Sequence, residues 1–174
     1  NDIGQELQSN FLLFADDLKL YSAVNSSKDR LILQSDINRL CDWCTINQMV
    51  MNVSKCCIMI FSRKVHQLPC QYYMHNDEMN VVTSVRDLGV QLDRKLSYMD
   101  HYDIIINKAN KMLGFLKRNT SDFRNPHTFV KLYTSLVRCH LDYCSSIWSP
   151  AFNVHVDRME KVQHRFLKFV NYKL

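Results

Sequence analysis

The sequence is poor in residues that interrupt regular structure, and it lacks long apolar runs. Its 174 residues include three Gly and three Pro, which argues against disordered, collagen-like and turn-rich β chains. No apolar run approaches the roughly 18 residues of a membrane helix, and the first ten residues, NDIGQELQSN, lack the basic and apolar regions of a signal peptide. Hydrophobic residues make up 47% of the chain, enough to bury the core of one large domain or two small ones. We therefore expect a folded protein that does not contact a membrane.

Seven cysteines are present, an odd number at irregular spacing. Without a secretion signal, reduced thiols in an intracellular protein, nuclear or cytoplasmic, are the simplest interpretation. Cys41 and Cys44, followed by Cys56 and Cys57, could suggest a zinc site. However, the first pair lies at core spacing on a predicted helix, and adjacent cysteines on a strand point to opposite faces, so this set suits a tetrahedral site poorly. We interpret these residues as buried free cysteines.

Charge is unevenly distributed along the chain. Residues 1–100 hold 10 Lys and Arg against 12 Asp and Glu, a net charge of −2. Residues 101–174 hold 12 Lys and Arg against 5 Asp and Glu, a net charge of +7. The second region therefore has a surface suited to a polyanion.

The first half of the chain has the pattern of strands around one helix. An apolar run at 11–15 and an alternating run at 17–23 predict two strands joined at an acidic pair. A capping Ser26, Asp29 in the first turn and apolar residues at helical spacing predict a helix over 28–46. Further strands are expected over residues 55–62, 71–75, 79–83 and 85–93.

Two turn features accompany these later strands. Asn76 and Asp77 lie between the strands at 71–75 and 79–83 and predict a hairpin. Gly89 lies inside the strand at 85–93, where it marks a bulge or a close approach of the backbone.

From residue 98 the pattern becomes helical. Three sets of apolar residues at helical spacing predict three helices, the second of which begins near Pro126, a favourable first-turn residue. The sets are Ile105, Ala109, Met112, Leu113 and Leu116; Phe129, Leu132, Tyr133, Leu136 and Tyr143; and Val156, Met159, Val162, Phe166 and Val170. We expect an α+β chain in which residues 1–97 combine antiparallel strands with a helix and residues 98–174 form a small helical bundle.

Two adjacent carboxylates, Asp16 and Asp17, stand between the first two predicted strands in NFLLFADDLKLYS. One interpretation is a solvated β-turn, in which Asp is common. The other is a metal site, because an apolar hairpin is a rigid mount and Mg²⁺ prefers hard oxygen ligands whose charge it neutralises. Two such ions can activate one oxygen and stabilise another during phosphoryl transfer. The composition of the stretch leaves both interpretations open.

Several segments, in order, resemble the reverse transcriptases of non-LTR (LINE-like, jockey-type) retrotransposons. FADD at 14–17 resembles their catalytic hairpin. The other segments are NDI at 1–3, DINRLCDWCTINQMVMNVSKCCIMIFSRK at 36–64, RDLGVQLDRKL at 86–96 and KLYTSLVRCHLDYCSSIWSP at 131–150. Together they cover nearly the whole chain. The resemblance implies the C-terminal part of a polymerase palm at 1–97, with catalytic hairpin and primer grip, and a helical thumb at 98–174.

The resemblance also implies an activity and its residues. The reaction would be RNA-directed DNA synthesis, in which a deoxynucleotide is added to a DNA primer on an RNA template with Mg²⁺ or Mn²⁺. Asp16 and Asp17 would hold the metals, and Lys55 would give a proton to the leaving pyrophosphate, with an ordinary surface lysine as the alternative. Leu88 and Gly89 would lie in the primer grip, where Gly lets the backbone approach nucleic acid closely.

Basic residues on two predicted helices point to nucleic acid independently of the resemblance. The residues that share a helical sector are Arg158, Lys161, Arg165 and Lys168 on one helix and, more loosely, Lys108, Lys111 and Arg118 on another. Each stripe alone could be a solvated helix face. Two stripes in a region of net charge +7 favour contact with the phosphate backbone of a primer–template duplex.

The catalytic site of the resembled family needs a further aspartate from an earlier strand, and Asp2 does not match its position. We therefore expect the chain by itself to be catalytically inactive. One alternative is a non-catalytic remnant that binds nucleic acid through the basic thumb. Another is an interaction domain that self-associates through an exposed apolar palm face.

Overall fold

The computed structural model of the chain describes residues 3–4, 7–62 and 71–173. Asp2, Cys70 and the last two residues of the segment at 36–64 lie outside the described residues. The chain is α+β, as the sequence predicts.

The structure divides into two compact units, residues 1–83 and residues 84–174, which we call the first and the second unit. This division falls earlier than the region boundary expected from the sequence between residues 97 and 98. The strands within residues 84–93 belong to the second unit because Val90, on the second of them, is buried in the apolar core that the helices of that unit form.

The first unit begins with an antiparallel hairpin of β1 (Asn10–Phe14) and β2 (Asp17–Tyr21). The register pairs Phe14 with Asp17 and leaves a two-residue turn at Ala15 and Asp16. Both strands lie within two residues of their predicted bounds. Leu20 of β2 packs against the apolar core of the first unit.

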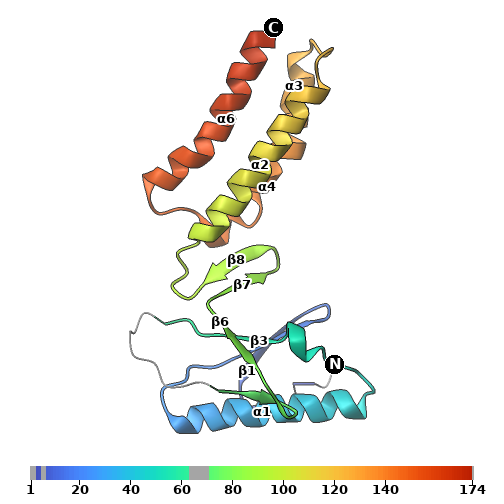
Figure 1. The fold of residues 1–174 in the computed structure, drawn as a ribbon, viewed down its shortest axis with the longest axis vertical. Coiled ribbons are helices and arrows are strands. Elements are labelled where there is room, and N and C mark those ends of the chain that lie inside the picture. The colour runs from blue at the N-terminus through green and yellow to red at the C-terminus, as the bar shows by residue number, and fades with distance from the viewer. Residues whose placement is uncertain (1–2, 5–6, 63–70, 174) are drawn as a thin grey trace. The chain divides into compact units, whose positions relative to one another are not determined.

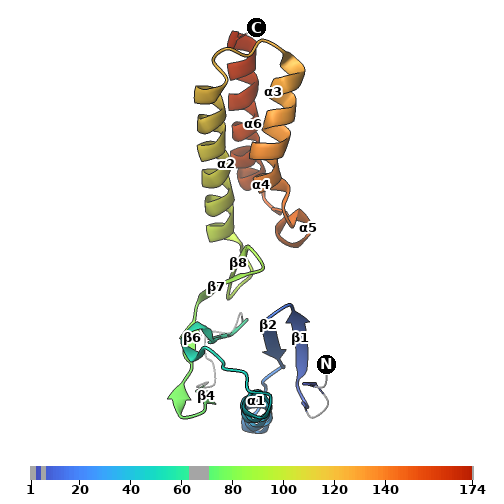
Figure 2. The same cartoon turned by 90° about the vertical axis from the view of Figure 1, so that its right-hand side faces the viewer.

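Helix α1 (Ser27–Ile46) begins where its capping signal lies. The Ser26 side chain accepts from the backbone N–H of Asp29, and the Asp29 carboxylate accepts from the backbone N–H of Ser26, a reciprocal capping box. The helix lies along one side of the strands of the first unit (Figures 1 and 2). Its buried residues are Asp36, Ile37, Leu40, Cys41 and Cys44. The predicted helix is therefore confirmed.

The other strands of the first unit are short. Their bounds, with the 3₁₀ turn that precedes them, are η1 (Val53–Lys55), β3 (Cys57–Met59), β4 (Tyr73–Met74), β5 (Asp77–Glu78) and β6 (Asn80–Val82). A hairpin is present near the predicted place, but β4 pairs with β5 around a turn at His75 and Asn76. The strand predicted over 79–83 contains β6 and is not the hairpin partner of β4. β3 and β6 pair in parallel, so the prediction of antiparallel strands throughout is wrong at this pair. The long connection between them allows the crossover that parallel pairing needs.

A buried carboxylate fastens the β1–β2 hairpin to α1. Asp36 is fully buried and accepts from the backbone N–H of Ser9 at 2.7 Å, from that of Gln8 at 3.1 Å and from Arg39 Nη1 at 3.0 Å. Burial disfavours ionisation, but the hydrogen bonds from Ser9 and Gln8 and the charge of Arg39 outweigh it, and the pKa of Asp36 is lowered. Because Gln8 and Ser9 lead into β1, this contact sets where the hairpin leaves the helix.

The second unit consists of a hairpin followed by helices. Their bounds are β7 (Ser84–Asp87), β8 (Val90–Asp93), α2 (Met99–Asn119), α3 (Pro126–Tyr133), α4 (Cys139–Asp142), α5 (Ser145–Trp148) and α6 (Asn153–Lys173). The first and third predicted helices are confirmed as α2 and α6. The second begins at Pro126 as predicted, but the π-helical segment η2 (Thr134–Arg138) separates α3 from α4. Within the described ranges, no helix combines the length and apolar character needed to span a bilayer.

Trp148 joins the parts of the core of the second unit. It is 2% exposed, accepts from Tyr102 Oη at 3.1 Å through its carbonyl oxygen, and donates from Nε1 to the carbonyl of Tyr143 at 2.8 Å. His101 lies edge-on to the indole, with ring centroids 5.2 Å apart, and its Nδ1 accepts from the backbone N–H of Gln91 at 3.2 Å. Burial lowers the pKa of His101, so that the ring is kept neutral between the hairpin and α2.

β7 and β8 replace the single strand predicted over 85–93. Leu88 and Gly89, with φ of 43° and 90°, form a two-residue turn between them. Positive φ at both turn residues is typical of a type I′ hairpin, whose twist matches that of its strands. Gly89 is therefore a turn residue, and the bulge interpretation is wrong.

Asp93 organises the chain between β8 and α2. Its carboxylate accepts from the backbone N–H groups of Lys95, Ser97 and Tyr98 at 2.8–2.9 Å. Burial opposes its ionisation, but these hydrogen bonds outweigh burial and lower the pKa of Asp93. The connection from the hairpin into the helix is thereby fixed by one side chain.

We predict that Asp36→Asn destabilises the first unit by about 2 kcal/mol, because an amide cannot accept from all of these donors. Urea unfolding followed by circular dichroism, with hydrogen exchange of the β1 amides, measures the effect. Since the folded pKa lies below the ordinary value of about 3.9, this stabilisation is present above roughly pH 4 and is lost as the pH falls further. The control is Asp42→Asn, an exposed carboxylate on the same helix. Equal stability of Asp36→Asn and wild type at neutral pH would contradict the anchoring role.

Candidate acidic hairpin and nucleic-acid-binding surface

The acidic pair lies at the exposed end of the β1–β2 hairpin. Asp16 is the second turn residue and Asp17 the first residue of β2, and both are exposed. Ala15, directly before them, has a φ of 53°, a left-handed conformation that is uncommon for a residue other than glycine. At the first residue of a two-residue hairpin turn a positive φ is ordinary, because it matches the twist of the strands, as at Leu88. The turn geometry alone leaves both the metal-site and the solvated-turn interpretations open.

β1 carries exposed apolar side chains up to the acidic pair. Leu12 and Phe14 are 56% and 63% exposed, and strand geometry places them on the same face. Among the strands of the described residues, β1 pairs with β2 alone. The hairpin therefore presents an apolar face next to its carboxylates that another segment could cover.

The part of the chain that the structure describes contains no group of three or more His, Cys, Asp or Glu side chains arranged to hold a metal ion. Asp16 and Asp17 by themselves still fit Mg²⁺ in part, because this ion is usually bound through one or two carboxylates together with waters and substrate phosphates. The zinc alternative gains no support. Cys41 and Cys44 are buried free thiols whose pKa is raised by burial, whereas Cys57, expected to be buried, is exposed.

Lys55 ends the 3₁₀ turn η1 and is exposed. Its backbone N–H donates to the carbonyl of Asn52 at 3.0 Å, which closes the turn before β3. Within the described residues, no hydrogen bond or ion pair joins Lys55 to Asp16 or Asp17. Its role as a proton donor remains a sequence prediction, and so does the surface-lysine alternative.

The turn of the β7–β8 hairpin, predicted to contact the primer, is fastened to the helices by Tyr143. Tyr143 Oη donates to the carbonyl of Leu88 at 2.9 Å. A Cβ added to Gly89 would lie 3.1 Å from Tyr143 Cε1. A glycine is therefore favoured at position 89 by the positive φ and by the close packing of the Tyr143 ring of the same chain. An approach of nucleic acid would be a further reason.

α2 and α6 run side by side in the same direction (Figures 1 and 2). Two polar contacts join them, and the second lies seven residues after the first on both helices. Arg158 forms an ion pair with Asp103. Arg165 Nη1 donates to Asn110 Oδ1 at 2.9 Å. Because seven residues are about two helical turns, these contacts follow one seam. Two of the four basic residues predicted on α6 thus hold the helices together.

The remaining predicted basic residues are exposed on the two helices. Lys161 and Lys168 lie beside the seam on α6, and Lys111 and Arg118 lie on the solvent side of α2. We call these four side chains the basic face. Lys108 lies farther round α2, where its charge contributes to the lowered pKa of His101. The basic face is therefore narrower than the two stripes predicted from helical spacing.

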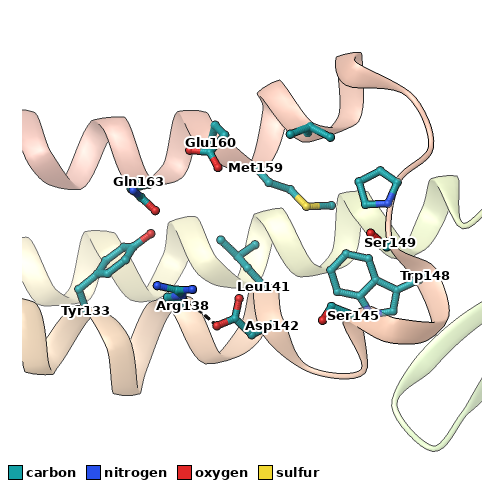
Figure 3. Close-up of a pocket in the computed structure, with 12 residues that line it drawn as sticks. Tyr133, Arg138, Leu141, Asp142, Ser145, Trp148, Ser149, Met159, Glu160 and Gln163 are labelled. Carbon is teal, nitrogen blue, oxygen red and sulfur yellow. Dashed lines mark hydrogen bonds and ion pairs between the residues drawn. The ribbon is translucent and has the colours of Figure 1, made fainter.

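A cavity of about 280 Å³ opens on another flank of α6 (Figure 3). Its polar lining includes Glu160 and Gln163 of α6 and an ion pair of 2.9 Å between Arg138 Nε and Asp142 Oδ2. Tyr133 closes one end, where its ring stacks on Phe166 with centroids 4.2 Å apart. None of the residues predicted for catalysis or nucleic-acid binding lines this cavity. It is not part of the acidic hairpin or of the basic face.

Two residues that position these surfaces escape sequence reasoning. In the sequence, Asp36 is one polar residue of a predicted helix. Its partners Gln8 and Ser9 donate from the backbone, so their residue types do not indicate the contact. Tyr143 reads as a core residue at helical spacing, yet it is 54% exposed. The helix ends at Asp142, and the backbone of Tyr143, with ψ of 122°, has already left the helical conformation.

Comparisons with protein-family models, with curated proteins and with solved structures found no match to this chain. The resemblance of its motifs to reverse transcriptases therefore stays an interpretation of the sequence.

We predict that Gly89→Ala destabilises the second unit by about 1–2 kcal/mol, because alanine disfavours a φ of 90° and its Cβ would crowd Tyr143. Thermal unfolding of Gly89→Ala and of a control variant measures the effect. Gly114→Ala is the matched control, because it lies inside α2 and its Cβ would meet only the flexible end of Arg118, at 3.4 Å. That variant should stabilise by up to about 1 kcal/mol. The same sign of effect for both variants would contradict the assigned role of Gly89.

Proposed function

We propose that this chain is the C-terminal palm and thumb portion of a non-LTR retrotransposon reverse transcriptase, acting in RNA-directed DNA synthesis. The observation that carries the proposal is the pair Asp16–Asp17, two adjacent carboxylates exposed at a tight hairpin turn. Adjacent like charges repel each other, and a bound divalent cation removes that cost. The ordered motifs of the sequence give the pair its polymerase context.

In this proposal the two carboxylates hold Mg²⁺ or Mn²⁺ at the end of the hairpin. A bound ion would activate the primer 3′-hydroxyl and stabilise charge on the phosphate being transferred. The carboxylates orient the ion, and Lys55 is the candidate acid for the leaving pyrophosphate. The apolar face of β1 would be covered by the strand that brings a further carboxylate, so the 174 residues alone would not extend a primer.

The basic face is proposed to follow the phosphate backbone of the template–primer duplex. Its four side chains are exposed on two adjacent helices that Arg158 and Arg165 hold in fixed alignment. Point charges on a rigid surface give affinity that does not depend on base sequence. Leu88 and Gly89 would add a contact to the primer at the hairpin turn.

A second candidate function is nucleic-acid binding without catalysis. It is favoured by the lack, in the described part of the chain, of a third metal-binding side chain beside Asp16 and Asp17. The two candidates share the basic face and differ in whether the acidic hairpin binds a metal. The following two experiments test these features separately.

We predict that Mn²⁺ broadens the amide resonances of the β1–β2 turn and that Asp16→Asn removes this effect, because one carboxylate binds the ion too weakly. The measurement is an NMR titration of the full chain. Asp77→Asn, at another hairpin that carries adjacent acidic residues, is the control and should leave the broadening unchanged. Broadening of wild type that is centred elsewhere, or that survives Asp16→Asn, would exclude a metal site at the acidic hairpin.

We predict that Lys161→Gln and Lys168→Gln each weaken binding to an RNA–DNA hybrid and lower the slope of log affinity against log salt by about one. Fluorescence anisotropy at several salt concentrations measures both quantities. Lys131→Gln, an exposed lysine on α3, is the matched control and should have a smaller effect. Equal effects of all three variants would show that general charge, rather than the basic face, determines binding.

A further inference from the structure

The β7–β8 hairpin has one face on the core and one in solvent. Val90 is 3% exposed, and Leu92 packs against the same core. The alternation of strand residues turns Gln91, and with it the paired Arg86, to the other face. Arg86 is exposed. The hairpin therefore presents a guanidinium group on its outer face, two residues before the turn.

Tyr143 restrains the turn from the side of the helices. Its hydroxyl reaches the carbonyl of Leu88 at 2.9 Å, and its ring lies against Gly89. Its own carbonyl accepts from Trp148 Nε1 at 2.8 Å, and Trp148 is buried in the core. A chain of contacts thus leads from the core, through Tyr143, to the end of the hairpin.

This restraint is not explained by burial. Tyr143 is 54% exposed and Leu88 is 40% exposed, so their contact shields little apolar surface. A surface hydrogen bond of this kind contributes modestly to stability. Its clearer effect is to reduce the number of positions that the turn and the adjacent strand ends can adopt.

We propose that Tyr143 is a positioning residue that locks the β7–β8 turn onto the helical bundle, so that Arg86 is held ready to contact a nucleic-acid phosphate. The proposal rests on the nucleic-acid-binding function proposed above and adds one contact residue, Arg86, and the residue that places it. An Arg–phosphate contact is charge-assisted and depends on geometry. A hairpin that is fixed before binding loses less conformational entropy when the nucleic acid binds than a mobile hairpin would.

The test is a double-mutant cycle on the full chain, with binding to a short RNA–DNA hybrid measured by fluorescence anisotropy at several salt concentrations. Arg86→Gln should weaken binding about tenfold and lower the salt slope by about one. Tyr143→Phe keeps the ring but loses the hydroxyl, and it should weaken binding about threefold. The double variant should bind about as weakly as Arg86→Gln alone. The reason is that the loss of the Tyr143 hydroxyl acts through the position of Arg86, and that side chain is already replaced.

Tyr172→Phe, a hydroxyl lost from a side chain that is 90% exposed on α6, is the matched control and should bind like wild type. Hydrogen exchange at the turn amides should become faster in Tyr143→Phe while the thermal midpoint stays close to that of wild type. Effects of Arg86→Gln and Tyr143→Phe that simply add, or wild-type affinity of Tyr143→Phe, would overturn the positioning role. A wild-type chain that does not bind the hybrid would instead overturn the proposed function, and the role of Arg86 with it.

Discussion

The base of the β1–β2 hairpin and the base of the β7–β8 hairpin are each held by an aspartate that accepts hydrogen bonds from several backbone N–H groups. The placement of the candidate site residues on these hairpins depends on this interaction. Asp36 accepts from Gln8 and Ser9, where the chain enters β1. Asp93 accepts from three backbone N–H groups between β8 and α2, those of Lys95, Ser97 and Tyr98. In both cases the hydrogen bonds favour the ionised carboxylate strongly enough to lower its pKa despite burial. Without these anchors, a two-stranded hairpin would be marginal in water.

The two units present opposite charge at their candidate sites. The first unit exposes Asp16 and Asp17 at a turn, and the second exposes the basic face along α2 and α6. A nucleic-acid phosphate that approached the acidic turn would be repelled by Asp16 and Asp17 unless a cation neutralised them. Metal and nucleic acid would therefore favour each other's binding at the acidic hairpin, as linkage requires when each stabilises the other. This coupling is the physical content of the polymerase proposal, and a binding remnant would lack it.

Sequence patterns predict the local elements of this chain well and their long-range contacts poorly. The helix over 28–46, the strands around the acidic pair and the start of α3 at Pro126 follow from capping, alternation and proline signals that lie within one turn of the element. The β7–β8 turn is missed because Leu88 replaces the Asn or Asp that usually announces a type I′ hairpin. The parallel pair β3–β6, the seam of Arg158 and Arg165, and the contact of Tyr143 with Leu88 join distant segments, so no local pattern reports them. The acidic pair stands out in the sequence because its two carboxylates are adjacent, but its role stays a prediction.

The most direct test of the account is chemical footprinting of the lysines with and without a bound RNA–DNA hybrid. Acetylation of the full chain, read by mass spectrometry, reports which amino groups the hybrid covers. We predict protection of Lys111, Lys161 and Lys168 on the basic face, and unchanged reactivity of Lys131 on α3 and Lys28 on α1. Protection centred on Lys131 or Lys28, or none on the basic face when the hybrid is bound, would contradict it.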